Sequence, residues 1–139
     1  MLIGEFTNNI DEKGRIIMPK KLRLELGSDF FITRGIDNCL WVLSEEEWKI
    51  FETKMKEQSF SKARDLQRFF FSAAAQPEIN AQGRVSIPPA LRAYANLEKD
   101  IVITGVLNRV EIWNSKDYYD RQSTLTSDQM AAVMEDIGF

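Results

Sequence analysis

Short apolar runs separated by polar turn residues extend along the whole chain, and they predict a mainly β protein with helices. Apolar and polar residues alternate loosely over 3–9, and denser apolar runs follow at 15–18, 30–33 and 39–43. Asp, Asn and Gly lie between these runs, and tight turns favour these residues. We therefore expect a strand over each of the four ranges, with a turn at 11–14 between the first two.

Helical signals lie between and after the strands. A short helix is expected from Pro19 to Leu26, because proline fits the first turn of a helix and Gly27 is suited to its C-terminus. Ser44 and Glu47 form a capping-box pattern that predicts the start of a second helix. The expected inner face of this second helix carries Trp48, Phe51 and Met55.

A third helix is expected over 61–74, because neither Gly nor Pro occurs between Gly35 and Pro77. The residues predicted to face inward are Leu66, Phe69, Phe70 and Ala73. The aromatic run 69–71 is more apolar than one helix face requires. It lies either at a junction between two parts of the chain or against another subunit, and we favour the junction.

A last helix is expected from Thr126 or Ser127. Its apolar stripe consists of Met130, Val133, Met134 and Ile137. Such a stripe usually packs on the core of its own chain. On a terminal segment, docking on a neighbouring subunit is a nearly equal alternative.

The chain contains one stretch twice, which decides its organisation. Residues 10–23 recur as 79–92 at a constant offset of 69. The repeated pairs are Gly14/Gly83, Arg15/Arg84, Pro19/Pro88, Leu22/Leu91 and Arg23/Arg92. Each copy predicts a turn opened by Asp11 or Asn80, then a strand and a short helix.

The resemblance of the two halves continues beyond this stretch. The apolar runs 101–105 and 110–113 match those of the first half, and Asn114 with Asp117 repeats the helix cap. Neither copy looks large enough to bury a good core alone. We therefore expect the copies to interlock as a pseudo-dimer, with six to eight strands in a closed structure that removes exposed sheet edges.

The composition leaves little for catalysis or metal binding. The chain has 139 residues and is 44% hydrophobic, with one cysteine and no histidine. Without histidine, a phosphate-binding loop or a nucleophile motif, we expect no enzyme, no metal and no cofactor. No signal peptide or membrane-spanning run is recognisable, so we expect a soluble, intracellular protein.

Charge is distributed unevenly along the chain. The formal net charge is −3, yet residues 11–23 carry a net +3 and residues 80–92 a net +2. Such asymmetry is typical of a local electrostatic footprint for nucleic acid, although a solvated face can give the same count.

Arginine held at a rigid turn is well suited to reach a partner. In double-stranded DNA it binds guanine O6 and N7 in the major groove, and lysines contact phosphates. We expect Arg15 to read bases and Lys13, Lys20 and Lys21 to contact phosphates. The alternative is that each arginine only pairs with the Asp or Asn four residues before it.

The doubled motif resembles the MraZ family, which belongs to the AbrB-like (SpoVT-AbrB) swapped-hairpin barrel proteins. The resemblance rests on Asp11-x-x-Gly14-Arg15, repeated as Asn80-x-x-Gly83-Arg84, and on Pro-x-x-Leu-Arg after each. It implies an α+β fold of two AbrB-like halves forming an intrachain swapped-hairpin β-barrel flanked by helices. The expected parts are a first half at 1–58, a helical connection at 59–76, a second half at 77–120 and a C-terminal helix at 121–139.

The resemblance also implies a function. The family's usual role is repression of the division and cell wall gene cluster, through short G-rich direct repeats upstream of it. Its members assemble as ring-shaped homo-oligomers, such as octamers, and the expected location is the cytoplasm at the nucleoid. Family DNA binding is attributed to a D-x-x-x-R motif, which maps to Asp11 with Arg15 and to position 80 with Arg84.

The second copy departs from this motif. Asn80 supports the same turn but cannot form a charged pair with Arg84, and the lysines of the first copy are missing. We expect the first copy to dominate DNA contact and Arg84 to be secondary or structural. The competing hypothesis is an antitoxin-like oligomeric scaffold, whose arginines hold subunits together and whose DNA affinity is incidental.

Overall fold

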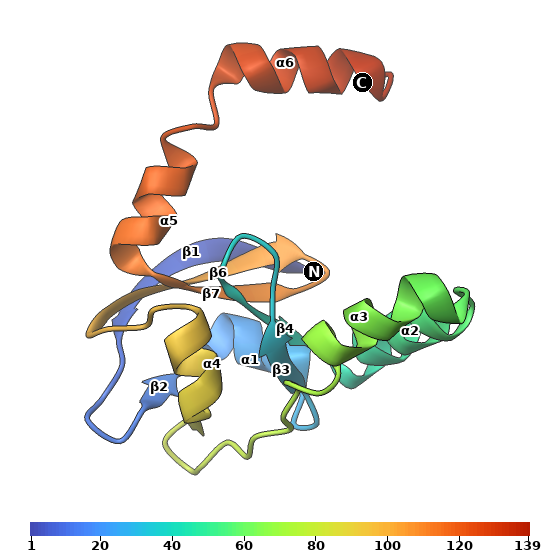
Figure 1. The fold of residues 1–139 in the computed structure, drawn as a ribbon. Helices are drawn as coiled ribbons and strands as arrows, with labels where there is room; N and C mark the ends of the chain where they lie inside the picture. The colour runs from blue at the N-terminus through green and yellow to red at the C-terminus, as the bar shows by residue number, and fades with distance from the viewer.

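The computed structural model describes residues 1–139, which fold into seven strands and six helices (Figure 1). The strands are β1 (Leu2–Asn9), β2 (Arg15–Ile17), β3 (Phe31–Arg34), β4 (Leu40–Leu43), β5 (Arg84–Ser86), β6 (Asp100–Leu107) and β7 (Val110–Asn114). The helices are α1 (Lys20–Leu26), α2 (Glu45–Lys56), α3 (Phe60–Phe70), α4 (Pro89–Tyr94), α5 (Ser115–Gln122) and α6 (Ser127–Asp136).

The strands form two sheets. Five of them make an antiparallel sheet in the order β1-β6-β7-β4-β3, and β2 pairs with β5 in a separate two-stranded ribbon. The predicted α+β class is therefore confirmed. Both sheets contain strands from each half of the sequence, so the halves are interlocked and do not stand as separate domains.

Two strand pairs relate the halves by a pseudo-twofold axis. In the ribbon, Ile16 lies opposite Val85, its own counterpart in the repeat. In the large sheet, Trp41 of β4 lies opposite Glu111, the matching position of β7. The sequence pattern suggests a hairpin of 3–9 with 15–18. Instead, β1 pairs with β6 and β2 with β5, because each hairpin is opened and shared with the other half.

The symmetry fails where the second half should repeat β1. Strand β1 pairs with β6 over eight positions, whereas the segment after α3 meets β3 only in an isolated bridge between Ala75 and Ile32. Pro77 follows two residues later and has no N–H to donate to a ladder. The bridge is thus the remnant of the β1–β6 pairing, and β3 is correspondingly short.

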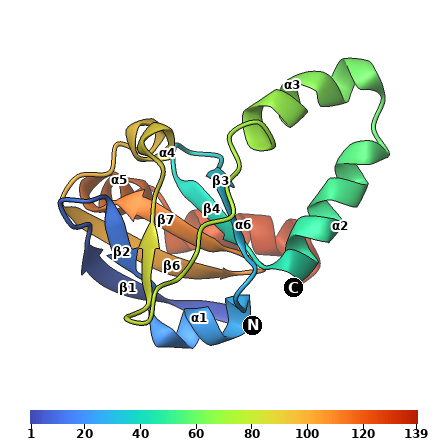
Figure 2. The ribbon, with the colours of Figure 1, turned by 90° about the horizontal axis from the view of Figure 1, so that it is seen from below.

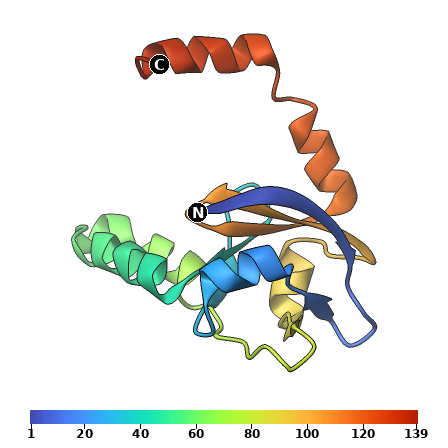
Figure 3. The same cartoon turned by 180° about the vertical axis from the view of Figure 1, so that it is seen from behind.

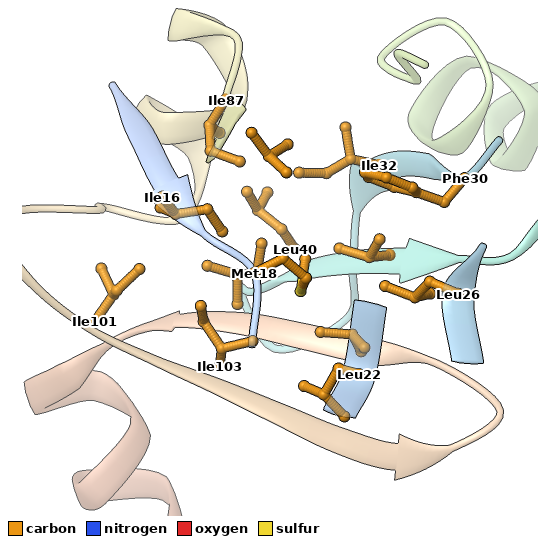
Figure 4. Close-up of a cluster of buried hydrophobic side chains, with 14 of the residues drawn as sticks. Ile16, Met18, Leu22, Leu26, Phe30, Ile32, Leu40, Ile87, Ile101 and Ile103 are labelled. Carbon is orange, nitrogen blue, oxygen red and sulfur yellow. The ribbon is translucent and has the colours of Figure 1, made fainter. Parts of the chain in front are cut away.

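One hydrophobic core serves both halves. It contains 17 buried residues, and Figure 4 shows side chains from the ribbon, from α1 and from the large sheet converging on it. Several counterparts in the repeat are buried to the same degree, including Ile16 with Val85 and Met18 with Ile87. Because burial of such a side chain contributes about 1.5–3 kcal/mol, splitting the halves would expose a core that neither can cover alone.

Helices α2 and α3 form an arm that projects from the sheets (Figure 2). Ser44 Oγ accepts the N–H of Glu47, so the predicted cap of α2 is confirmed. Arg34 of β3 ties the arm to the sheet by donating from Nε to the carbonyl of Phe69 at 2.9 Å and from Nη2 to that of Arg68 at 3.2 Å.

Two predictions about α3 are wrong. The helix ends at Phe70 and does not reach residue 74, because the chain turns there toward the bridge with Ile32. Leu66 is exposed, and Ala63 takes the inward position instead. The aromatic run lies at a junction, as favoured: Phe69 packs edge-to-face on Tyr94 of the second half at 5.8 Å between ring centroids.

The C-terminal helices differ in their packing. Asn114 caps α5 by accepting the N–H of Asp117 at 3.0 Å, as the repeat predicts. By contrast, α6 stands away from both sheets, as Figures 1 and 3 show, and has no buried residue. None of the six helices combines the length and apolar character needed to span a membrane.

Candidate nucleic-acid interface

The first turn is held by the Asp11 side chain. Its Oδ1 accepts the backbone N–H groups of Lys13 at 2.9 Å and Arg15 at 2.8 Å, and its carbonyl accepts that of Gly14 at 3.0 Å. Gly14 closes the turn at φ 77°, a conformation that costs other residues free energy. Arg15 therefore leaves the turn in a fixed direction.

The second turn repeats this geometry. Asn80 Oδ1 accepts the N–H groups of Gln82 at 3.0 Å and Arg84 at 2.9 Å, and Gly83 lies at φ 81°. The amide oxygen replaces the carboxylate without changing the backbone. The sequence prediction that Asn supports the same turn is confirmed.

The two arginines differ in their side-chain contacts. Arg15 Nε donates to Asp11 Oδ2 at 2.8 Å, whereas the Arg84 side chain has no hydrogen bond within the chain. The pKa of Asp11 lies below its usual value, first because the Arg15 backbone N–H binds the carboxylate and further through the Arg15 side chain. The expected pairing thus exists in the first copy, but Nη1 and Nη2 of Arg15 remain free for a partner.

The ribbon presents both arginines on one face. Ile16 and Val85 point into the core, so their neighbours Arg15, Ile17, Arg84 and Ser86 point outward. Arg15 lies opposite Ser86, and Arg84 lies opposite Ile17. The arginines are therefore diagonal neighbours on the outer face, with the two turns beyond them. The Arg15 side chain is 30% exposed. Asp11 holds its Nε, while the end of the guanidinium group stays accessible.

The predicted lysines are all exposed. Lys13 lies in the first turn, and Lys20 and Lys21 open α1, which is separated from the end of the ribbon strand β2 by two residues. None of the three takes part in an ion pair within the chain. Their charges are therefore available to a partner.

Sequence reasoning missed the part played by Arg23 and Arg92. Each packs over the turn glycine of the other half: Arg92 of α4 covers Gly14, and Arg23 of α1 covers Gly83. Arg92 Nε also donates to the carbonyl of Ile87 at 3.0 Å. Each turn is thus braced by the opposite copy of the repeat. The recurrence of both arginines at the repeat offset was the available signal.

Two open hollows flank the turns, with volumes of about 720 and 740 Å³. The first contains Asp11, Glu12 and Glu98, and the second contains Asp29 and Glu78. Carboxylates outnumber cations in the first by three to two and in the second by two to one, so neither hollow suits an anion. No group of three or more Cys, Asp or Glu residues is placed to hold a metal ion.

These features define a class: an internally duplicated α+β protein with swapped hairpins and paired, arginine-bearing turns on a shared ribbon. The chain belongs to the MraZ family. The family model described as "MraZ protein, putative antitoxin-like" matches residues 1–69 and again residues 70–137.

Relatives of this chain match it over almost its whole length. A protein of Alkaliphilus metalliredigens is 45% identical, and one of Halothermothrix orenii 46% identical, each over 99% of both chains. A protein of Limosilactobacillus reuteri is 47% identical over 99% of this chain and 97% of its own. All three are named "Transcriptional regulator MraZ". The family is therefore one of regulators and not of enzymes, as expected.

Proposed function

We propose that this protein is a transcriptional regulator that binds double-stranded DNA in a sequence-specific manner. The observation that carries the proposal is the placement of Arg15 and Arg84 on the outer face of a two-stranded ribbon. A ribbon of this width fits the major groove, where the donor and acceptor pattern distinguishes all base pairs. The names of the relatives support the same function.

The proposed roles follow from the contacts of each side chain. Arg15 reads bases with its free terminal nitrogens, because Asp11 fixes its Nε and so limits the entropy lost on binding. Lys13, Lys20 and Lys21 contact phosphates. Arg84 is secondary, since no partner within the chain orders it.

The finer assignments rest on family membership. The protein represses the division and cell wall gene cluster, binds short G-rich direct repeats upstream of it, and acts at the nucleoid in the cytoplasm. It assembles as a ring, such as an octamer. A ring supports binding by a chain of net charge −3, because linked turns that engage successive repeats raise the effective concentration of each.

Fluorescence anisotropy of a labelled duplex tests the proposal. The duplex carries the upstream direct repeats, and a scrambled duplex is compared at two salt concentrations. Loss of one bidentate arginine–guanine contact costs about 1–3 kcal/mol, so Arg15→Ala should weaken binding to the repeats about 5- to 140-fold. Arg84→Ala should weaken it less. Arg64→Ala, an exposed arginine on α3, is the matched control and should have no effect.

Two outcomes would contradict parts of the proposal. Equal weakening by Arg84→Ala and Arg15→Ala would refute the dominance of the first copy. Weak binding that is equal for both duplexes and insensitive to Arg15→Ala would favour the antitoxin-like scaffold, in which these arginines serve assembly. Binding through several phosphates must also fall steeply with salt.

A further inference from the structure

Helix α6 carries an apolar stripe that nothing in its own chain covers. Met130, Val133, Met134 and Ile137 lie on one side of the helix and are 37–70% exposed. The helix stands away from both sheets in Figures 1 and 3. A contiguous apolar patch of this kind marks an interaction site.

The polar residues of α6 restrict the partner. Its charged residues are Asp128, Glu135 and Asp136, with no lysine or arginine. Helices that lie on anionic membranes carry cations on the polar face, and nucleic acid repels an acidic helix. The partner is therefore a protein surface that combines apolar side chains with cations.

The chain itself contains such a surface. A hollow of about 280 Å³ lies between α2 and the neighbouring strands, lined by Trp41, Leu43, Ile50 and Phe51 with Lys54 and Arg109 beside them. We call it the α2 groove. Ile50 is 46% exposed, and one acidic side chain, Glu47, also lines the groove. Lys49 and Lys56 on the same helix are paired with Glu45 and Glu52, whereas Lys54 has no ion pair.

We propose that the α6 stripe of one copy docks in the α2 groove of a neighbouring copy of this chain. The apolar side chains fill the groove, and Asp136, at the flank of the stripe, lies near the unpaired charge of Lys54. The inference deepens the proposed function, because it names the surfaces that would build the ring.

The two surfaces differ, so the contact is head-to-tail. A contact of this type leaves one α6 and one groove free at the ends of every open assembly, and it closes only as a ring. The test uses this property. Val133→Asp disables α6 but leaves the groove intact, and Ile50→Asp disables the groove but leaves α6 intact.

Both substitutions lie at exposed positions, so the fold should survive, and circular dichroism checks this. Without DNA, each variant alone should sediment as a monomer of 16.1 kDa. An equimolar mixture of the two should form a dimer of twice that mass and nothing larger, because only one functional contact can form. Leu66→Asp, an exposed leucine on α3, should assemble like the wild type.

Several results would overturn the proposal. These are unchanged assembly of either variant, a mixture that stays monomeric, or a wild type in which α6 docks on its own groove. The last is detected by Ile50→Cys with Val133→Cys in one chain, whose crosslink would then form within a monomer. The native Cys39 does not interfere, because it is fully buried. DNA binding is measured separately, so failure of the regulator proposal and failure of this contact are distinguishable.

Discussion

Substitution of Gly14 by alanine tests whether the opposite half braces the first turn. A Cβ at this position would lie 2.6 Å from Cζ of Arg92, so the guanidinium must move. Its movement breaks the hydrogen bond from Arg92 Nε to the Ile87 carbonyl. The backbone of residue 14 would also carry a side chain at φ 77°.

The magnitude follows from these two losses. A non-glycine residue in the left-handed conformation costs about 1–2 kcal/mol. A hydrogen bond from a charged donor contributes about 1.5–3 kcal/mol, and we take the lower end because Arg92 is half-buried. Gly14→Ala should therefore lower the free energy of unfolding by about 2.5–3.5 kcal/mol in sum.

A double-mutant cycle separates the two losses. Arg92→Ala removes the same hydrogen bond, so the double variant should lose it only once. The double variant should then cost about 1.5 kcal/mol less than the sum of the single variants. Urea unfolding followed by tryptophan fluorescence, at one protein concentration, measures all four proteins.

The second turn supplies the matched control. Arg23 covers Gly83 in the same way, but its side chain makes no hydrogen bond within the chain. Gly83→Ala and Arg23→Ala should therefore be nearly additive. Additivity within about 0.5 kcal/mol at Gly14 and Arg92, or equal coupling at both turns, would refute the bracing by Arg92.

Three further predictions concern the turn, the sheet and the core. Asp11→Asn should keep the turn but remove the charged pair with Arg15. Because folding lowers the pKa of Asp11 from about 3.8, the wild type alone should lose the stability contributed by this pair as the pH falls from about 3.8 through the lowered pKa. The midpoints of urea unfolding, measured over this pH range, check the difference. Gly105→Ala would place a Cβ 2.5 Å from the backbone nitrogen of Ile3, so thermal unfolding should show a loss of about 1–3 kcal/mol or more. Burial raises the pKa of Cys39 to about 12, so a thiol reagent at pH 8 should modify this cysteine only when the protein unfolds. The buried neutral thiol contributes to the free energy of unfolding below pH 9, and this contribution should be lost as the pH rises from 9 through 12.

The elements that depend on local sequence could be predicted. The turn at 11–14, the cap at Ser44 and the short helix before Gly27 all depend on residues within a few positions of one another. Strand partners could not be predicted in this way. The alternation over 3–9 indicates a strand but not that β6, about a hundred residues later, is its neighbour. Leu66 was misplaced for the same reason: the buried position, Ala63, lies in one cluster with Met55 of α2, and the sequence of α3 alone does not identify that neighbour.

In the candidate site, too, the features that depend on local sequence could be predicted and the long-range contacts could not. The repeat identified both turns and the arginines that follow them, since the motif itself fixes that geometry. It also contained Arg23 and Arg92, but their contacts with the opposite turns exist only once the halves are interlocked.

The interlocking gives the two turns a shared structural support. The backbone of Gly14 accepts the N–H of Ile87, and that of Gly83 accepts the N–H of Met18, so each turn is bonded to the strand end of the other copy. With the crossed arginines, each half supplies part of the frame that positions the other half's turn. A half-chain would therefore lose both its core partner and the support of its turn. Asn80 can stand where the motif has Asp because its amide oxygen accepts the same two backbone N–H groups as Asp11 Oδ1, and the opposite half supports the turn as well. The second carboxylate oxygen of Asp11 adds the orientation of Arg15.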